Sequence, residues 1–163
     1  MSSKTRKMCM IGDYGVGKTS LIRRFVERQF SDQYLSTVGV KISRKTLTFN
    51  LLDQEQELKL LIWDIEGQTK FKAIAPSYLQ GAAGVLIVAD VERKETIEHF
   101  SDHLELCHCV NPQAMIVGAL NKRDLVNEQE LDFLEKIARE KLASGINIYQ
   151  TSAKTGINVD QIF

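Results

Sequence analysis

The sequence predicts an α/β fold in which a mostly parallel six-stranded sheet carries helices on both faces. Apolar, β-branched runs alternate with segments of helical period along the chain, which favours parallel strands joined by crossover helices. A glycine-rich loop follows the first apolar run, where sheets of this kind bind ligands. A length of 163 residues fits one domain with a sizeable core, so we expect a single domain over residues 1–163.

Two runs separated by a polar turn at residues 53–56 predict an antiparallel edge hairpin. The other runs are bounded by loops or by helical segments and predict parallel strands. The expected strands cover residues 8–11, 40–49, 58–65, 84–91, 114–120 and 146–149.

Apolar stripes at helical spacing predict the helices between these strands. The first helix is expected over residues 18–28, directly after the glycine-rich loop. Asn158 and Gln161 form a capping pair that opens a last helix, which the sequence cuts short at Phe163. We therefore expect a chain truncated in its C-terminal helix. The other two stripes are Ile97, Phe100, Leu104, Cys107 and Leu131, Leu134, Ile137, Ala138, Leu142.

Composition excludes several classes of protein. Lys and Arg number 21 and Asp and Glu number 21, so no net charge favours nucleic acid or a membrane surface. The apolar runs are too short to cross a bilayer, and no signal peptide begins the chain. Three cysteines form no disulfide framework. We expect a cytoplasmic monomer that binds no nucleic acid.

The glycine-rich loop, residues 12–19, has the spacing Gly-x-x-x-x-Gly-Lys-Thr. Between a strand and a helix this spacing is typical of a phosphate cradle, because glycines let backbone N–H groups wrap closely around the anion. Lys18 adds a full positive charge, and the Thr19 hydroxyl is a ligand for Mg²⁺. The alternative is a glycine-rich turn that holds no phosphate.

Further motifs follow at the ends of later strands. Asp64 is placed to hold Mg²⁺, and the N–H of Gly67 to meet a terminal phosphate. The Asp124 carboxylate, in Asn-Lys-Arg-Asp, can accept two hydrogen bonds from guanine that adenine cannot supply together. Ala153 can present its N–H to the guanine O6. Thr37 lies in a loop, from which its hydroxyl reaches Mg²⁺ only when a γ-phosphate is present.

Together and in this order, the motifs resemble those of the Ras superfamily of small GTPases along essentially the whole chain. The resemblance implies a P-loop NTPase G domain. It is strongest to the Rab group, through Phe30 and Tyr34-Leu35-Ser36-Thr37-Val38-Gly39-Val40, through Ile62-Trp63-Asp64, and through Ser77-Tyr78-Leu79-Gln80-Gly81-Ala82.

Matching positions imply a role for each motif residue. GTP or GDP and Mg²⁺ would be the cofactors, with Mg²⁺ held by Thr19, Thr37 and Asp64. Gln68, Lys18 and Thr37 would be catalytic, with Gln68 orienting the attacking water. The implied nucleotide-binding residues are Gly12, Tyr14, Gly15, Val16, Gly17, Lys18, Thr19, Ser20, Phe30, Thr37, Gly67, Asn121, Lys122, Asp124, Ser152, Ala153 and Lys154.

The same resemblance implies a switch that protein partners read. Effector, exchange-factor and activating proteins would contact the segments from Gln33 to Val40 and from Glu66 to Tyr78. Membrane attachment would require a C-terminal tail that the sequence lacks.

Several positions depart from the family pattern. The family has Thr-Ala-Gly-Gln-Glu after the Mg²⁺ aspartate, and this chain has Ile-Glu-Gly-Gln-Thr, so Glu66 replaces alanine. Tyr14 occupies a loop position that is glycine in Ras and usually small in Rabs. The Glu66 carboxylate either faces the phosphates or turns outward to Lys70 or Lys72. A module that binds guanine nucleotide with very slow or no hydrolysis is therefore an alternative. The Asn-Lys-Arg-Asp motif opposes a third class, an ATP-dependent kinase.

His99, His103 and Cys107 follow one another at four-residue steps on one predicted helix. That spacing permits a shared metal, but no fourth ligand is evident. We favour packing and solvated surface for these side chains.

Overall fold

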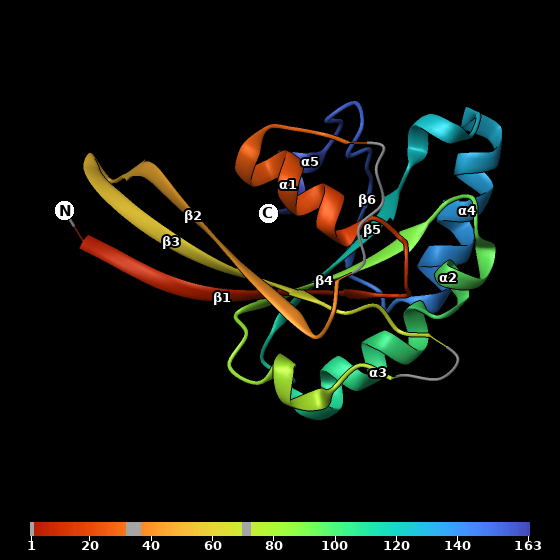
Figure 1. Ribbon diagram of the computed structural model, residues 1–163, viewed down its shortest axis with the longest axis horizontal. Helices are drawn as coiled ribbons and strands as arrows, with labels where there is room; N and C mark the ends of the chain where they lie inside the picture. The colour runs from red at the N-terminus through yellow and green to blue at the C-terminus, as the bar shows by residue number, and fades with distance from the viewer. Residues whose placement is uncertain (1, 32–36, 70–72) are drawn as a thin grey trace.

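A six-stranded sheet in the order β2-β3-β1-β4-β5-β6 forms the centre of the computed structural model (Figure 1), which describes residues 2–31, 37–69 and 73–163. β2 and β3 pair antiparallel, and every other neighbouring pair is parallel. The predicted fold class is confirmed. The strands are β1 (Ser2–Gly12), β2 (Val40–Leu51), β3 (Gln54–Ile65), β4 (Gly84–Asp90), β5 (Met115–Asn121) and β6 (Asn147–Gln150).

The first three strands are longer than their apolar runs predict. β1 begins at Ser2 rather than at residue 8, because its polar half pairs in parallel with β3. Backbone hydrogen bonds hold that half, and they leave no trace in the hydrophobic pattern. The hairpin turn is also tighter than predicted, since Leu52 and Asp53 both take left-handed φ angles, of 51° and 60°. Two consecutive residues with positive φ angles form a two-residue turn whose twist matches the twist of the antiparallel strands.

Helices cover both faces of the sheet. In Figure 1, α1 and α5 lie on one side of the strands and α3 lies on the other. Among the described residues, no helix has the length and apolar character needed to cross a bilayer. The helices are α1 (Lys18–Glu27), α2 (Lys94–Glu98), α3 (Phe100–Val110), α4 (Glu128–Lys141) and α5 (Val159–Ile162), with 3₁₀ turns at Pro76–Leu79 and Arg123–Leu125.

Alternating side chains of the central strands supply the two halves of the core. Cys9 and Ile11 of β1 belong to the cluster under α2, α3 and α4, whereas Met10 belongs to the cluster under α1 and α5. The predicted stripe from Ile97 to Cys107 is buried in the first cluster, although the chain divides it into two helices at His99. The helical period therefore identified buried side chains correctly but missed the break.

The predicted capping pair at the last helix is wrong. Asn158 precedes α5 but has a left-handed φ of 57° and makes no side-chain cap. Its amide instead donates a hydrogen bond to the carbonyl of Gln150, 2.8 Å away. The helix end is held by packing, because the Phe163 ring stacks on Phe25 with 4.3 Å between ring centroids.

The three cysteines have different environments, which predicts different thiol reactivity. Burial raises the pKa of Cys9 to about 11 and that of Cys107 to about 12, whereas Cys109 is exposed. A thiol reacts as its thiolate, so we expect the folded chain to release one equivalent of thionitrobenzoate from Ellman's reagent rapidly, through Cys109. Denaturation exposes all three thiols. Rapid labelling of the folded Cys109→Ser variant would contradict this assignment.

Candidate functional site

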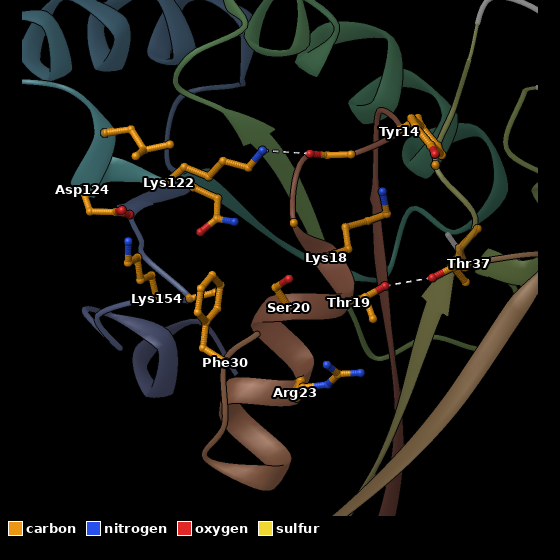
Figure 2. Close-up of a pocket in the computed structure, with 17 residues that line it drawn as sticks. Tyr14, Lys18, Thr19, Ser20, Arg23, Phe30, Thr37, Lys122, Asp124 and Lys154 are labelled. Atoms are coloured by element: carbon orange, nitrogen blue, oxygen red, sulfur yellow. Dashed lines mark hydrogen bonds between the residues drawn. The ribbon is translucent and has the colours of Figure 1, made fainter. Parts of the chain in front are cut away.

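The carboxyl ends of the parallel strands border a cavity of about 320 Å³ (Figure 2). Most of the predicted nucleotide-binding residues line it, from six separate stretches of the chain. Three further side chains that the sequence analysis missed also line it, and they are Arg23, Ile65 and Leu125. The predicted residues that line it are Tyr14, Gly15, Gly17, Lys18, Thr19, Ser20, Phe30, Thr37, Gly67, Asn121, Lys122, Asp124, Ala153 and Lys154.

Three predicted residues lie behind the cavity wall. Val16 is buried in the core under α1. A Cβ on Gly12 would lie 2.4 Å from the carbonyl oxygen of Val88, so this glycine is required where β1 passes β4. The buried Ser152 donates its hydroxyl hydrogen bond to Asp124 instead of facing the cavity.

The glycine-rich loop is fastened to the end of β5. Gly17 has a φ of 103°, and a Cβ there would lie 2.3 Å from Nδ2 of Asn121. That amide donates to the carbonyl of Val16 at 3.0 Å. The ammonium of Lys122 donates to the carbonyl of Gly15, also at 3.0 Å (dashed in Figure 2). Two motifs far apart in the sequence therefore fix one loop.

Lys18 carries its charge at the N-terminus of α1, 6% exposed. Its Nζ donates to the carbonyl of Asp13 at 3.0 Å. Burial lowers the pKa of Lys18 to about 8, and the nearby carboxylates of Asp64 and Asp13 oppose that shift. An anion in the cavity would favour the protonated form further, because it adds negative charge beside a desolvated ammonium.

The three residues predicted to hold a metal converge at one end of the cavity. Thr19 Oγ1 lies 2.5 Å from Asp64 Oδ2 and 2.8 Å from Thr37 Oγ1. Asp64 Oδ1 is buried, with no hydrogen-bond partner among the described residues. Burial raises the pKa of Asp64, and the Thr19 hydroxyl and Lys18 oppose that rise. Closely grouped hydroxyl and carboxylate oxygens, one of them unpaired, fit a hard cation such as Mg²⁺.

The opposite end of the cavity has the groups predicted to meet a base. Figure 2 shows Phe30, Asp124 and Lys154 gathered there. Asp124 Oδ1 accepts a hydrogen bond of 2.7 Å from the Ser152 hydroxyl, which orients the carboxylate. The carboxylate is exposed and can accept further hydrogen bonds.

Gln68 is held against the glycine-rich loop by its backbone. Its N–H donates to the Gly12 carbonyl at 3.0 Å, and its carbonyl accepts from the Tyr14 N–H at 2.9 Å. A Cβ on Gly67 would lie 2.5 Å from the Cα of Tyr14, so only glycine fits this approach. Gln68 is not among the residues that line the cavity, and its catalytic role stays a prediction.

The Glu66 carboxylate contacts the backbone that precedes β2. Its carboxylate accepts a hydrogen bond of 3.0 Å from the N–H of Gly39, and its own N–H donates to the Gly39 carbonyl at 2.8 Å. Residues 70 and 72, the predicted partners for an outward carboxylate, lie outside the described residues, as do residues 33–36 and 71 of the predicted partner-binding segments. The Glu66 side chain thus links the end of β3 to the start of β2.

Two histidines reach the glycine-rich loop, which the sequence analysis did not foresee. His99 and His103 both contact the Asp13 carboxylate, and Cys107 packs in the core instead. Among the residues described, no group of three or more His, Cys, Asp or Glu side chains could hold a metal. The shared-metal alternative gains no support among these residues. The His103 side chain is 1% exposed and the His99 side chain 42% exposed, which agrees with packing and solvated surface, and both also contact the Asp13 carboxylate. Only the four-residue spacing of the two histidines hinted at a common target.

Comparison with known proteins agrees with this geometry. Residues 7–163 match the Ras family. Rab-22A of Homo sapiens is 36% identical over 165 residues, an alignment that covers 100% of this chain and 82% of that protein. Rab-1A of Dictyostelium discoideum is 38% identical over 161 residues (96% and 76% covered), and the GTP-binding protein ypt4 of Schizosaccharomyces pombe is 35% identical over 160 (96% and 68%). The chain therefore belongs to the Ras family, as a Rab-like small GTPase.

Proposed function

We propose that this protein is a molecular switch that binds GTP or GDP with Mg²⁺ and hydrolyses GTP. One observation carries the proposal: a phosphate loop, a cluster of metal-binding oxygens and an oriented carboxylate line or border a single cavity. The relative named GTP-binding protein ypt4 supports the same ligand.

Each end of the cavity has a distinct task in this proposal. Thr19, Thr37 and Asp64 would hold Mg²⁺, which supplies positive charge to the β- and γ-phosphates. Lys18 would neutralise charge that develops on the phosphates during hydrolysis, since its ammonium is already desolvated. The Asp124 carboxylate would select guanine by accepting hydrogen bonds from two N–H groups of the base.

The switch would lie in two segments of the chain, residues 33–40 and 66–78. Thr37 lies in the first segment and Gly67 in the second, and both line the cavity. A γ-phosphate would therefore contact both segments, and its loss would release them. Effector, exchange-factor and activating proteins would read the difference, and membrane attachment would need a C-terminal tail.

Two observations favour a second candidate, a guanine-nucleotide-binding module with very slow or no hydrolysis. The backbone of Gln68 is paired to the glycine-rich loop, and Tyr14, whose N–H donates to the Gln68 carbonyl, lines the cavity and is 41% exposed. A tyrosine at that place obstructs an arginine supplied by an activating protein. Identifying the nucleotide that co-purifies, and then measuring single-turnover GTP hydrolysis, separates the two candidates. Retention of GTP without turnover supports the second.

Base selectivity tests the role of Asp124. We expect Asp124→Asn to lower GTP affinity by at least about a hundredfold and to improve binding of xanthosine triphosphate, because the amide complements the extra carbonyl of xanthine. Competition against a fluorescent nucleotide measures both affinities. Asp132→Asn, on the exposed face of α4, is the matched control. ATP rivalling GTP in the unmodified protein would contradict the assignment.

The oxygen cluster predicts metal dependence through Thr19. Thr19→Asn removes the hydroxyl that contacts Asp64 and Thr37, so we expect Mg²⁺-dependent GTP affinity to fall at least about tenfold and GDP affinity to fall less. Titration calorimetry with and without Mg²⁺ measures this. Thr19→Ser keeps the hydroxyl and serves as the control. Equal losses for both nucleotides would show that Thr19 supports only the folding of the loop.

The hydrogen bond from Gly39 to Glu66 predicts that the glutamate does not disfavour GTP. We expect Glu66→Ala to leave the ratio of GTP to GDP affinity within about twofold, and to lower the free energy of unfolding by about 1 kcal/mol. Glu66→Gln keeps an acceptor oxygen, so we expect it to be more stable than the alanine variant. An affinity ratio that moves toward GTP in Glu66→Ala would place the carboxylate beside the phosphates.

A further inference from the structure

The carboxylate of Asp13, in the phosphate loop, is enclosed by two imidazoles. Asp13 Oδ2 lies 2.5 Å from Nδ1 of His99, at the junction of α2 and α3. Asp13 Oδ1 lies 3.0 Å from Nε2 of His103, in the first turn of α3. Asp13 is 7% exposed and His103 is 1% exposed. Each carboxylate oxygen thus has one imidazole partner.

This pairing addresses an electrostatic conflict in the loop. A carboxylate beside an anionic ligand weakens binding, and the Asp13 side chain is not among those that line the cavity. Burial raises the pKa of Asp13, but the hydrogen bonds and charges of His103 and His99 outweigh burial and hold the pKa below its usual range. The carboxylate is therefore ionised, and the imidazoles hold it toward α3.

The main chain of Asp13 belongs to the nucleotide machinery. Its carbonyl accepts a hydrogen bond from Lys18 Nζ at 3.0 Å. The backbone also pairs with Gln68 in an isolated parallel bridge. A change in how the side chain is held therefore reaches the phosphate lysine and the segment after β3 directly.

The other charged groups around this cluster come from three elements. Lys18 of α1 interacts electrostatically with Asp13. Arg93, after β4, donates to the carbonyl of the residue that follows Asp13 and pairs with Asp90. Glu98 and Asp102 neighbour the histidines along the chain, and Glu98 pairs with Lys94 of α2. Lys18, whose pKa is lowered to about 8, takes up its proton mostly above neutral pH, whereas imidazole in general takes up a proton between about pH 5.5 and pH 7.5.

Proton uptake by an imidazole changes both the anchor and the local charge. A neutral imidazole donates one hydrogen bond to the carboxylate from the nitrogen that faces it. A protonated imidazole donates a charge-assisted bond, which is stronger, and adds positive charge beside the phosphate loop. Both effects hold the loop and an anionic ligand more tightly at lower pH.

We propose that His99 and His103 are positioning residues of the nucleotide site, which act through Asp13 and make nucleotide release slower as the pH falls. The proposal rests on the proposed function, since it concerns the release of guanine nucleotide. The hydrogen bonds described for both histidines go to Asp13, whose backbone carbonyl accepts a hydrogen bond from the cavity-lining Lys18.

The test measures release of methylanthraniloyl-GDP from the full chain at fixed Mg²⁺, between about pH 5.5 and pH 7.5. We expect release from the unmodified protein to slow by about fivefold as the pH falls. In the double variant His99→Asn, His103→Gln, side-chain amides supply neutral donors near the same positions but take up no proton, so we expect a flatter profile. His108→Gln, an exposed histidine on the same helix, is the matched control and keeps the original profile.

If the release rate of the double variant depends on pH in the same way as that of the unmodified protein, the inference is overturned. If that variant loses its circular dichroism spectrum, ¹⁵N titration of the imidazoles in the unmodified protein decides instead. The proton-uptake midpoint of His99 or His103 must then coincide with the midpoint of the release rate, and absence of titration over this range would overturn the proposal. A chain that retains no guanine nucleotide at any pH would overturn the proposed function itself.

Discussion

A phosphate loop can present its N–H groups to an anion only if its carbonyl oxygens have donors elsewhere. In this protein each of the first five carbonyls of the loop accepts a hydrogen bond, and four of them do so from a cationic side chain. Lys18 donates to the carbonyls of Gly12 and Asp13, and Arg93 donates to the carbonyl of Tyr14. Lys122 donates to the carbonyl of Gly15, and Asn121 donates to the carbonyl of Val16. The remaining geometry of the site follows from this arrangement.

Asp90 keeps two of these cations in place. Its carboxylate is almost fully buried and pairs with Arg93 at 3.2 Å and with Lys122 at 2.8 Å. A buried carboxylate lowers the stability of the fold unless it is paired with a cation. The repulsion between two cations beside one loop is in turn offset when a carboxylate lies between them. The end of β4 thus links the Asn-Lys-Arg-Asp motif after β5 to the glycine-rich loop.

The sequence allowed the fold and most of the cavity to be predicted, because both depend on local signals. Periodicity located the strands and helices, and glycine spacing located the loop before α1. The partners of Glu66 and Asp13 could not be predicted in this way. Gly39 is 27 residues from Glu66, and the two histidines are 86 and 90 residues from Asp13. Such contacts depend on how β2 and α3 pack, which no local pattern records.

The polar half of β1 determines where the amino end of the chain lies. Gly12, at the carboxyl end of β1, opens the phosphate loop, whereas Ser2 lies at the far end of the strand, beside the hairpin of β2 and β3 (Figure 1). At about 3.3 Å per residue, a strand of 11 residues separates the two by roughly 35 Å. An affinity tag or a surface linkage at the amino end therefore leaves the cavity at the carboxyl ends of the strands open, so immobilised protein can exchange ligand with the flowing solution.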